Sequence, residues 1–538
     1  MIRKIFIEDI DDERTNAIKL ILDTEKIPYS FTKNATDRDF KESLFLFTNT
    51  FNSKASFYLI LNPEMLERPL QVNQSEPLKL KTNIEKISEV LKEFNLPEEI
   101  GIPSIPVFKL LDYQGAQMAK IFVDNVEYPA VIKQENAIIF LFDILTLFIS
   151  LISENYFEKT KEKNVLSNSL IEKIYKKIPY SLRIPIYRKY YKKVHKNLNK
   201  LNEFKTNFPI EPAGYVLFEL IKNSILHFTN IIRISRWPTN YNYSVLITHD
   251  TEPTKYAYKK GLKLLLNKLA ENNLKSTITL VSNYVRYIPK QEIERIKIHE
   301  LGCHDLYHDR KFLLIPPYER KERLKTAKEI LEKTFDREIT FFRAPTLQRP
   351  PDLLDSLEET GYKYDSSIID SQREQPYCGK GNSFFLPFYP IINNKKSNIL
   401  ELPISAPDCI SPYFFGYSMQ ETLNLFETKI KFIEKVNGLA VFIVHTPAWG
   451  KKDAQNRLLL LDTILESSKN SFLTNIKELT DWWESRSNLF LEITGNKIIL
   501  NNNNKKEIHN ISVKIETIEK IAEIKVPKIT PEEKLIIA

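Results

Sequence analysis

The stretch SVLITHDTEP, residues 244–253, is an apolar run that ends in a histidine and two acids. A strand needs only one polar residue to end, so His249, Asp250 and Glu252 within four positions require a further explanation. Because successive side chains of a strand point to opposite faces, the carboxylates of residues 250 and 252 point the same way. The stretch therefore predicts a buried strand that delivers two carboxylates to one face at its end.

Around this stretch the chain repeats apolar strand-like runs that are separated, in most gaps, by helical patterns. The runs are YSVLIT, STITLV, IKIHELG, EITFFRA, GYKYDSS, NILELPI and LAVFIVH. Strands that alternate with helices favour a parallel sheet, because parallel neighbours need crossover connections. Seven such runs favour a closed or nearly closed β/α barrel over an open sheet. The predicted fold class is α/β.

The 538 residues are too many for one hydrophobic core, so we expect several domains. Residues 1–132 mix strand and helix patterns and predict an N-terminal α/β domain. Residues 133–240 predict a helical connecting region, and residues 241–486 predict the barrel. Residues 487–538 alternate apolar and polar side chains between turns, which predicts a small C-terminal antiparallel β module.

Composition and charge limit the classes of partner. The chain has 77 Lys and Arg against 69 Asp and Glu, a net charge of +8, so no nucleic-acid partner is expected. The Lys- and Tyr-rich residues 154–205 predict the solvated face of a helix, with peripheral contact to an anionic membrane as the alternative. The apolar residues 137–152 are short for a membrane span and include Asp143, so they predict a buried helix.

Two further features bear on the cellular compartment. The three cysteines are far apart and show no paired spacing, which indicates neither a disulfide framework nor a cysteine-based zinc site. The N-terminal MIRKIFIEDIDDERT has acids where a signal peptide needs a long apolar core. We therefore expect a cytoplasmic protein.

Ionisable residues recur at the ends of the predicted strands, and this rim is where a β/α barrel carries its active site. Besides Asp250 and Glu252, the third strand ends in CHDLYH, the fourth in RAP (Arg343–Pro345), the fifth in Tyr364–Asp365 and the last in His445. Taken singly, each has an ordinary structural explanation, such as helix capping by the acids or packing by the histidines. Their shared placement favours a chemical role.

His304 and His308 in CHDLYH are four residues apart, so on a helical turn both imidazoles face one way. Two neutral imidazoles and one carboxylate form a three-ligand metal site that leaves a position for water, the usual design of a hydrolytic metal centre. The second carboxylate could act as a base, Arg343 could hold it ionised, and His445 could protonate a leaving amine. The rim thus predicts a hydrolase.

These motifs resemble those of the polysaccharide deacetylase superfamily, carbohydrate esterase family 4 and its relatives, over roughly residues 243–486. THDT at 248–251 is similar to the Thr-Phe-Asp-Asp motif of that family, IHELGCHDLYH to its H-x-x-x-H motif, RAP to Arg-x-Pro and AVFIVH to its last strand. The resemblance implies a distorted seven-stranded barrel that hydrolyses N- or O-acetyl groups of a glycan. It also implies a divalent metal, Zn²⁺ first, with Co²⁺, Mn²⁺, Fe²⁺ and Ni²⁺ as alternatives.

The resemblance carries a role to each matching position. These are the general base Asp250, the metal ligands His304 and His308, the base-orienting Arg343, the general acid His445, and Asp365 as the partner that holds His445. Pro345, Tyr307 and Trp449 are the candidates for substrate contact. The two aromatics could stack on a sugar ring, and packing at the barrel rim is the alternative reading.

Three positions depart from the family pattern. Thr251 stands where the commonest motif has a metal-binding Asp, but the spacing of residues 250–252 resembles a branch of long relatives with Asp-x-Asp, with Glu252 as the ligand. Asp305 stands where Ser or Thr is usual, which changes the surroundings of the ligands. Thr346 replaces an aromatic that lines the sugar site, which bears on the glycan preference.

Three functions follow from these patterns. The first is a metal-dependent deacetylase acting on a glycan or glycan precursor. The second is an inactive relative that binds glycans or serves as a scaffold, favoured if Thr251 marks a lost metal site. The third is an amidase acting on a small non-sugar amide, because the superfamily includes relatives that act on cyclic amides. Metal content and the hydrolysis of acetylated oligosaccharides distinguish these functions.

Overall fold

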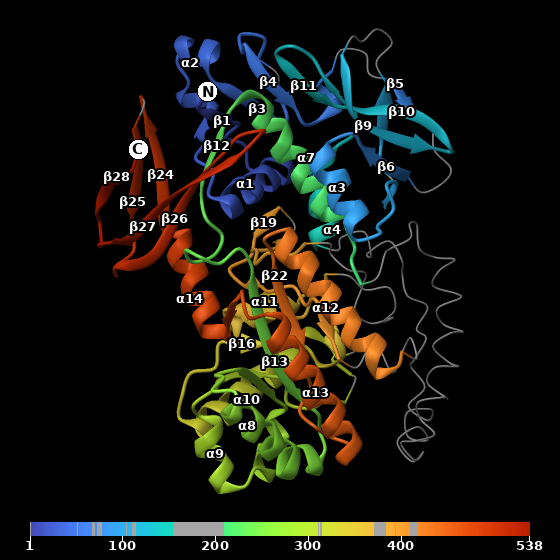
Figure 1. The fold of residues 1–538 in the computed structure, drawn as a ribbon, viewed down its shortest axis with the longest axis vertical. Helices are drawn as coiled ribbons and strands as arrows, with labels where there is room; N and C mark the ends of the chain where they lie inside the picture. The colour runs from blue at the N-terminus through green and yellow to red at the C-terminus, as the bar shows by residue number, and fades with distance from the viewer. Residues whose placement is uncertain are drawn as a thin grey trace.

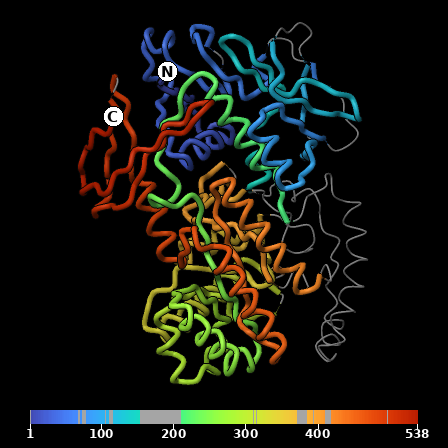
Figure 2. The backbone as a smooth tube through the Cα atoms, viewed as in Figure 1, coloured from blue at the N-terminus to red at the C-terminus, as the bar shows by residue number. Residues whose placement is uncertain are grey.

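The computed structural model describes residues 2–50, 52–66, 70–72, 78–103, 105–109, 115–153, 209–309, 311–312, 315–370, 384–392, 394–408, 417–495 and 497–538. An N-terminal α/β part, a parallel-stranded β/α domain and a pair of C-terminal antiparallel sheets follow one another along the chain (Figure 1). The two terminal parts lie beside each other at one end of the molecule, although they are far apart in sequence (Figure 2). The predictions for the basic residues 154–205, and for part of the connecting region 133–240 that contains them, lie outside the described residues.

The N-terminal part is a nine-stranded sheet with a parallel and an antiparallel half. The parallel half has the order β2 (Ser30–Phe31), β1 (Ile5–Ile7), β3 (Leu44–Phe47), β4 (Phe57–Ile60), β11 (Ala137–Phe140). The antiparallel half continues with β10 (Val126–Lys133), β9 (Ala116–Val123), β6 (Leu78–Thr82), β7 (Ile100–Ile102), and β5 (Leu70–Val72) pairs separately with β8 (Val107–Lys109). The order of the parallel half is that of a flavodoxin-like doubly wound sheet.

Helices cover this sheet, and the N-terminal part continues past residue 132 with strand β11 and helix α4. The helices are α1 (Glu13–Glu25), α2 (Asp37–Glu42), α3 (Glu85–Glu93) and α4 (Ile144–Ser153). The apolar residues 137–152, predicted as one buried helix, are a buried strand followed by a buried helix. The change from strand to helix occurs at Asp143. Its carboxylate accepts a hydrogen bond from the N–H of Thr146 (3.0 Å) and forms an ion pair with Arg14 (2.7 Å). Among the described helices, none has both the length and the apolar character needed to cross a membrane.

The β/α domain is built on parallel strands, as predicted. Its sheet runs β20 (Leu400–Glu401), β17 (Tyr364–Asp365), β16 (Phe341–Phe342), β15 (Glu300–Cys303), β14 (Thr277–Leu280), β13 (Ser244–Thr251), β22 (Leu439–Ile443), β21 (Ala406–Pro407), and β23 (Phe472–Thr474) also pairs with β13. Every pairing in it is parallel. The seven predicted strands are all present, and the sheet curves as a distorted half-barrel whose central strand, β13, is buried along its whole length.

Helices follow most of these strands and place the strand ends on one rim. They are α8 (Leu262–Glu271), α9 (Lys290–Ile296), α10 (Pro317–Phe335), α11 (Leu353–Glu359), α12 (Met419–Lys435), α13 (Lys451–Ser467) and α14 (Ile476–Ser487). Gly261, at the start of α8, is required by a close approach: a Cβ there would lie 1.9 Å from the carbonyl oxygen of Pro447. The helix after β13 therefore touches the loop that follows β22.

The C-terminal residues form two antiparallel sheets, in agreement with the predicted β module. One contains β24 (Leu489–Thr494), β25 (Lys497–Asn502) and β28 (Lys534–Ile536). The other contains β26 (Ile508–Glu516), β27 (Ile521–Ile529) and β12 (Ile231–Ile234), a strand that precedes the β/α domain. Because β12 follows helix α7 (Ala213–Phe228) of the connecting region, that region and the C-terminal module are joined by backbone hydrogen bonds.

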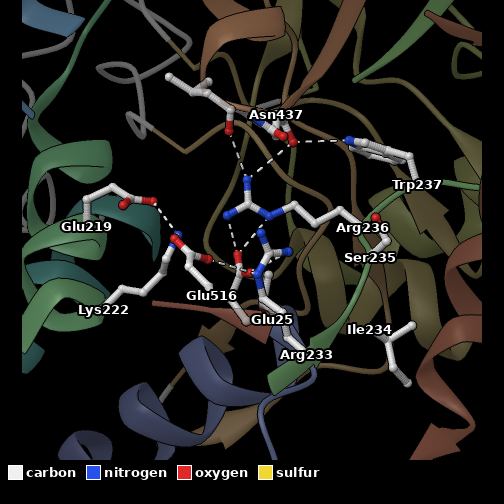
Figure 3. Close-up of polar contacts among 12 residues, drawn as sticks. Glu25, Glu219, Lys222, Arg233, Ile234, Ser235, Arg236, Trp237, Asn437 and Glu516 are labelled. Carbon is white, nitrogen blue, oxygen red and sulfur yellow. Dashed lines mark hydrogen bonds and ion pairs between the residues drawn. The ribbon is translucent and has the colours of Figure 1, made fainter. Parts of the chain in front are cut away.

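A buried charge cluster joins all of these parts (Figure 3). Glu25 at the end of α1 pairs with both Arg233 and Arg236. Arg233 also pairs with Glu516 of β26 (3.3 Å), and Arg236 donates to the carbonyl of Asn437 in the turn before β22 (3.2 Å). Buried charges are tolerated only when they are paired, so this cluster fixes the terminal parts against the turn that leads into the last strand of the barrel.

Candidate functional site

Asp250 lies at the end of β13 with its carboxylate buried among polar partners. Its Oδ1 accepts a hydrogen bond from Thr279 Oγ1 (2.6 Å), and its Oδ2 lies 3.5 Å from Nη1 of Arg343. Burial alone would raise the pKa of Asp250, but Arg343, His304, His445 and the hydrogen bond from Thr279 together outweigh it and hold that pKa well below its ordinary range. Asp250 is therefore an ionised carboxylate.

Arg343, at the end of β16, is fully buried and points into the barrel. Its Nη2 donates to Ser366 Oγ (2.9 Å) and to Thr248 Oγ1 (3.4 Å). Within the described residues its Nε and Nη1 make no hydrogen bond, so the guanidinium keeps donor groups beyond those that fix it. The predicted pairing of Arg343 with the carboxylate of Asp250 is present.

His304 follows β15 with its ring orientation fixed by a backbone carbonyl. Its Nδ1 lies 2.9 Å from the carbonyl oxygen of Arg343, and since a carbonyl can only accept, Nδ1 carries the proton and Nε2 keeps its lone pair. Burial lowers the pKa of His304 to about 4, so the imidazole is neutral near pH 7. The ring of His308 lies beside it, with 5.1 Å between the ring centroids. The two predicted imidazole ligands are thus neighbours.

Glu252 lies close to these imidazoles. Burial opposes its ionisation, but His308, His445, Arg457 and His304 together lower its pKa below the ordinary value. Glu252 Oε1 lies 3.9 Å from Nε2 of His445. The carboxylate is therefore ionised and surrounded by nitrogen groups.

The donor set fits a divalent metal in its chemistry. A neutral imidazole with a free Nε2, a second imidazole beside it and an ionised carboxylate are the ligand types that zinc sites use. In the part of the chain that the structure describes, however, no three His, Cys, Asp or Glu side chains are gathered closely enough to hold one ion. The pair His304–His308 is brought together, and the complete set with Glu252 stays a prediction.

His445 follows β22 and is held by Asp408, not by the predicted Asp365. Asp408 Oδ1 lies 2.6 Å from His445 Nδ1, and Asp408 Oδ2 accepts from the N–H of His445 and from Arg457 Nη1. Burial disfavours the charged ring, but Asp408 outweighs it and raises the pKa of His445 above its ordinary value. His445 is therefore suited to donate a proton from Nε2.

The prediction that Asp365 holds His445 is wrong because of the strand order. Asp365 lies at the end of β17, whose neighbours are β16 and β20, and its carboxylate accepts from Ser367 Oγ (2.6 Å). Asp408 directly follows β21, which pairs with β22. The available signal was SAPD, residues 405–408: an acid after a short run that follows ELPI.

Of the three residues that depart from the family pattern, Thr251 and Asp305 have side-chain partners in the structure. Thr251 Oγ1 lies 3.0 Å from Thr446 Oγ1, on the opposite face of the strand from Asp250. Asp305 is buried with a positive φ of 64° and is paired with Arg323; burial raises the pKa of Asp305 to about 6 in spite of that pairing. Thr346 has a φ of 51° inside a short turn.

The three candidates for substrate contact differ in exposure. Tyr307 and Trp449 are 43% and 38% exposed, so both aromatic rings reach the surface near the rim. The ring of Tyr307 also covers the guanidinium of Arg323, at 5.3 Å. Pro345 is buried. Contact of all three with a substrate stays a prediction.

Residues 239–364 match the family model described as Polysaccharide deacetylase. The chain carries a polysaccharide deacetylase domain. The matched residues contain Asp250, Glu252, His304, His308 and Arg343. The strands β21 and β22, which bring Asp408 and His445 to the rim, follow the match in the same parallel sheet.

Solved structures similar to this chain cover the deacetylase domain. A putative polysaccharide deacetylase from Mycobacterium smegmatis is 16% identical, over 48% of this chain and 96% of that one, with a TM-score of 0.37. The allantoinase PuuE is 14% identical, over 47% and 93%, with a TM-score of 0.39. BA3943 of Bacillus anthracis, described as a CE4 family pseudoenzyme, is 12% identical, over 44% and 64%, with a TM-score of 0.28. No curated protein matches the chain.

Proposed function

We propose that the chain is a metal-dependent hydrolase that removes acetyl groups, N-acetyl first, from a glycan or glycan precursor. The observation that carries this proposal is the protonation pattern at one rim. An ionised carboxylate (Asp250), a neutral imidazole (His304) and an imidazole whose pKa is raised (His445) lie at the ends of three strands of one sheet. Hydrolysis of an amide needs a base, a ligand and an acid in these states.

Each residue has a task in this proposal. Asp250, held ionised by Arg343, accepts the proton of the attacking water. His445 donates the proton of Nε2 to the leaving nitrogen, while Asp408 fixes its ring through Nδ1. His304, His308 and Glu252 would hold a divalent ion, Zn²⁺ first, which when bound lowers the pKa of water and polarises a carbonyl group.

A second candidate is an inactive relative that binds an acetylated glycan. It is favoured by one observation: among the described residues, no three potential ligands are gathered about one point. In this candidate the buried rim groups would serve binding, with Tyr307 and Trp449 as the exposed aromatic contacts.

The test is metal analysis of the purified full chain, followed by acetate release from an N-acetylated chitooligosaccharide with added Zn²⁺ or Co²⁺. The proposal expects stoichiometric metal and acetate release, and both should be lost in His304→Ala. The matched control is His509→Ala, a histidine of the C-terminal module with a 58% exposed side chain, which should keep both.

Two other outcomes would replace the proposal. A chain that holds no metal and releases no acetate, yet binds the oligosaccharide, would be the inactive binder. A chain that hydrolyses only small non-sugar amides would be an amidase. Unchanged metal content and rate in His304→Ala would remove His304 from either hydrolytic account.

A further inference from the structure

Two acids of neighbouring strands meet inside the barrel and take no part in the chemistry proposed above. Asp365 of β17 and Glu401 of β20 are paired in register, and both side chains are 0% exposed. Residues in register on neighbouring strands point to the same face of a sheet. The carboxyl groups of Asp365 and Glu401 therefore lie side by side on one face of the sheet.

Two buried carboxylates in contact cannot both be ionised, because their repulsion adds to the cost of burying each charge. Burial, followed by the charge of Glu401, raises the pKa of Asp365 well above its ordinary range. The charged groups facing the pair are Arg349, which opposes this shift, and Arg343, which reaches Ser366. Among the described residues Asp365 Oδ2 and Glu401 Oε2 have no hydrogen-bond partner, and one proton shared between them would satisfy both.

The other oxygens of the pair hold the backbone that follows β17. Glu401 Oε1 accepts hydrogen bonds from the N–H groups of Ser367 (3.1 Å) and Ile368 (2.8 Å). Asp365 Oδ1 accepts from Ser367 Oγ (2.6 Å), and Ser367 Oγ accepts from the N–H of Ala344 (2.9 Å). The pair is therefore connected to the residue next to Arg343.

A second connection reaches Arg343 itself. Ser366 lies between Asp365 and Ser367. Its hydroxyl accepts a hydrogen bond from Arg343 Nη2 (2.9 Å) and donates one to the carbonyl of Leu402 (2.6 Å). Leu402 follows Glu401 directly. The segment 365–368 is thus fixed at both of its serines, and both serines contact the RAP motif.

We propose that Asp365 and Glu401 form a proton-sharing carboxyl pair that positions the Arg343–Ala344 segment beneath the site. Both acids act through Ser367, which contacts Ala344, so they are positioning residues. The existence of the pair is independent of the proposed function, and its effect on catalysis rests on that function.

The shared proton is tested by the thermal stability of the full chain as a function of pH. Folding keeps a proton that the unfolded chain releases above about pH 4, so stability falls as the pH rises from there through the raised pKa of Asp365. Asp365→Asn supplies an amide N–H in place of the proton and should remove this part of the decline. Glu338→Gln, whose native side chain is 63% exposed, should keep it. The same pH dependence in the wild type and in Asp365→Asn would overturn the proposal.

The positioning role is tested by hydrogen exchange in two variants of Glu401. Glu401→Leu leaves the N–H groups of Ser367 and Ile368 without an acceptor, and their exchange and that of Ala344 should accelerate about tenfold or more. Glu401→Gln keeps an acceptor and a donor toward Asp365, so it should restore protection. Equal exchange in the two variants would overturn the positioning role. If Glu401→Leu does not fold, Glu401→Gln is compared with the wild type, and a loss of protection in Glu401→Gln would overturn it.

Catalysis adds a separate readout. On an N-acetylated chitooligosaccharide with Zn²⁺, Glu401→Leu should lower kcat about tenfold at an unchanged KM, and Glu401→Gln should regain most of it. A wild type that releases no acetate would refute the proposed function. The stability and exchange measurements would still decide whether the pair exists.

Discussion

His445 Nδ1 lies 2.6 Å from Asp408 Oδ1, so the acid that follows β21 holds the histidine that follows the neighbouring β22. Asp408 is itself fixed by Arg457 of α13, through Nη1 at 2.6 Å. Because the carboxylate accepts the hydrogen bond of Nδ1–H, only Nε2 of the ring can exchange a proton with a substrate. The direction of proton transfer at this rim is therefore set by a contact between two strands.

Asp408→Asn should lower kcat and move the basic limb of the pH profile to lower pH. Asp408 raises the pKa of His445 against the effect of burial, so its removal lets the imidazole lose its proton earlier as the pH rises. Loss of a positioned general acid lowers rates by about 10²- to 10⁴-fold. The measurement is acetate release as a function of pH. Asp462→Asn, on α13 and with a 44% exposed side chain, is the control and should change neither property.

Arg343→Gln should move the acid limb of the profile to higher pH. Arg343 is the main charge that lowers the pKa of Asp250 against burial, and an Asp beside an Arg has its pKa lowered by about one to three units. Without the guanidinium, Asp250 is protonated at a higher pH and can no longer act as a base there. Arg343→Lys keeps a positive charge, so the acid limb of its profile should lie between those of the wild type and Arg343→Gln. A profile of kcat/KM that coincides with that of the wild type would show that Asp250 is not the base.

Much of the barrel could be predicted from sequence because each strand carries its own apolar pattern. The run 244–251 is buried along β13, and the polar residues after it reach the rim as expected. The strand β21 was missed because it has only two residues, one of them a proline, which no periodicity can show. Asp408 was missed for the same reason, because its role depends on the pairing of β21 with β22 and not on the pattern of its own segment.

The apolar residues 137–152 show a different limit. A continuous apolar run does not distinguish a buried strand from a buried helix. Asp143 decides where the strand ends, but only because Arg14 and Thr146 are there to meet its carboxylate. The pair of Asp365 and Glu401 was likewise beyond prediction, because the pairing of β17 with β20 joins residues that are far apart in sequence.

Zinc should raise the thermal stability of the full chain. A ligand that binds only the folded state adds about 2.7 kcal/mol to the free energy of unfolding at about one hundred times its Kd. The gain should disappear in His304→Ala and in His308→Ala, because the two neighbouring imidazoles are the expected ligands. It should remain in His509→Ala, whose imidazole lies far along the chain in β26. Thermal unfolding with Zn²⁺ and then with a chelator measures the effect, and an equal gain in all variants would place the ion elsewhere.

Glu25→Gln should destabilise the whole chain by about 3–5 kcal/mol, because it leaves the buried Arg233 and Arg236 without their shared counter-charge. The arginines lower the pKa of Glu25 against burial, and the pKa of Glu516 is lowered to about 2. Both acids therefore contribute stability that is present above about pH 4 and is lost as the pH falls toward 2.

Urea unfolding at neutral and acid pH measures this contribution. Glu25→Gln should lose stability at neutral pH and lose less on acidification than the wild type does. Glu99→Gln, at an exposed ion pair of the N-terminal part, should change the free energy of unfolding by less than about 0.5 kcal/mol. If the deacetylase domain kept its full stability in Glu25→Gln while only the N-terminal part unfolded, the charge cluster would not hold the turn at Asn437. The terminal parts would then be attached to the barrel without supporting β22.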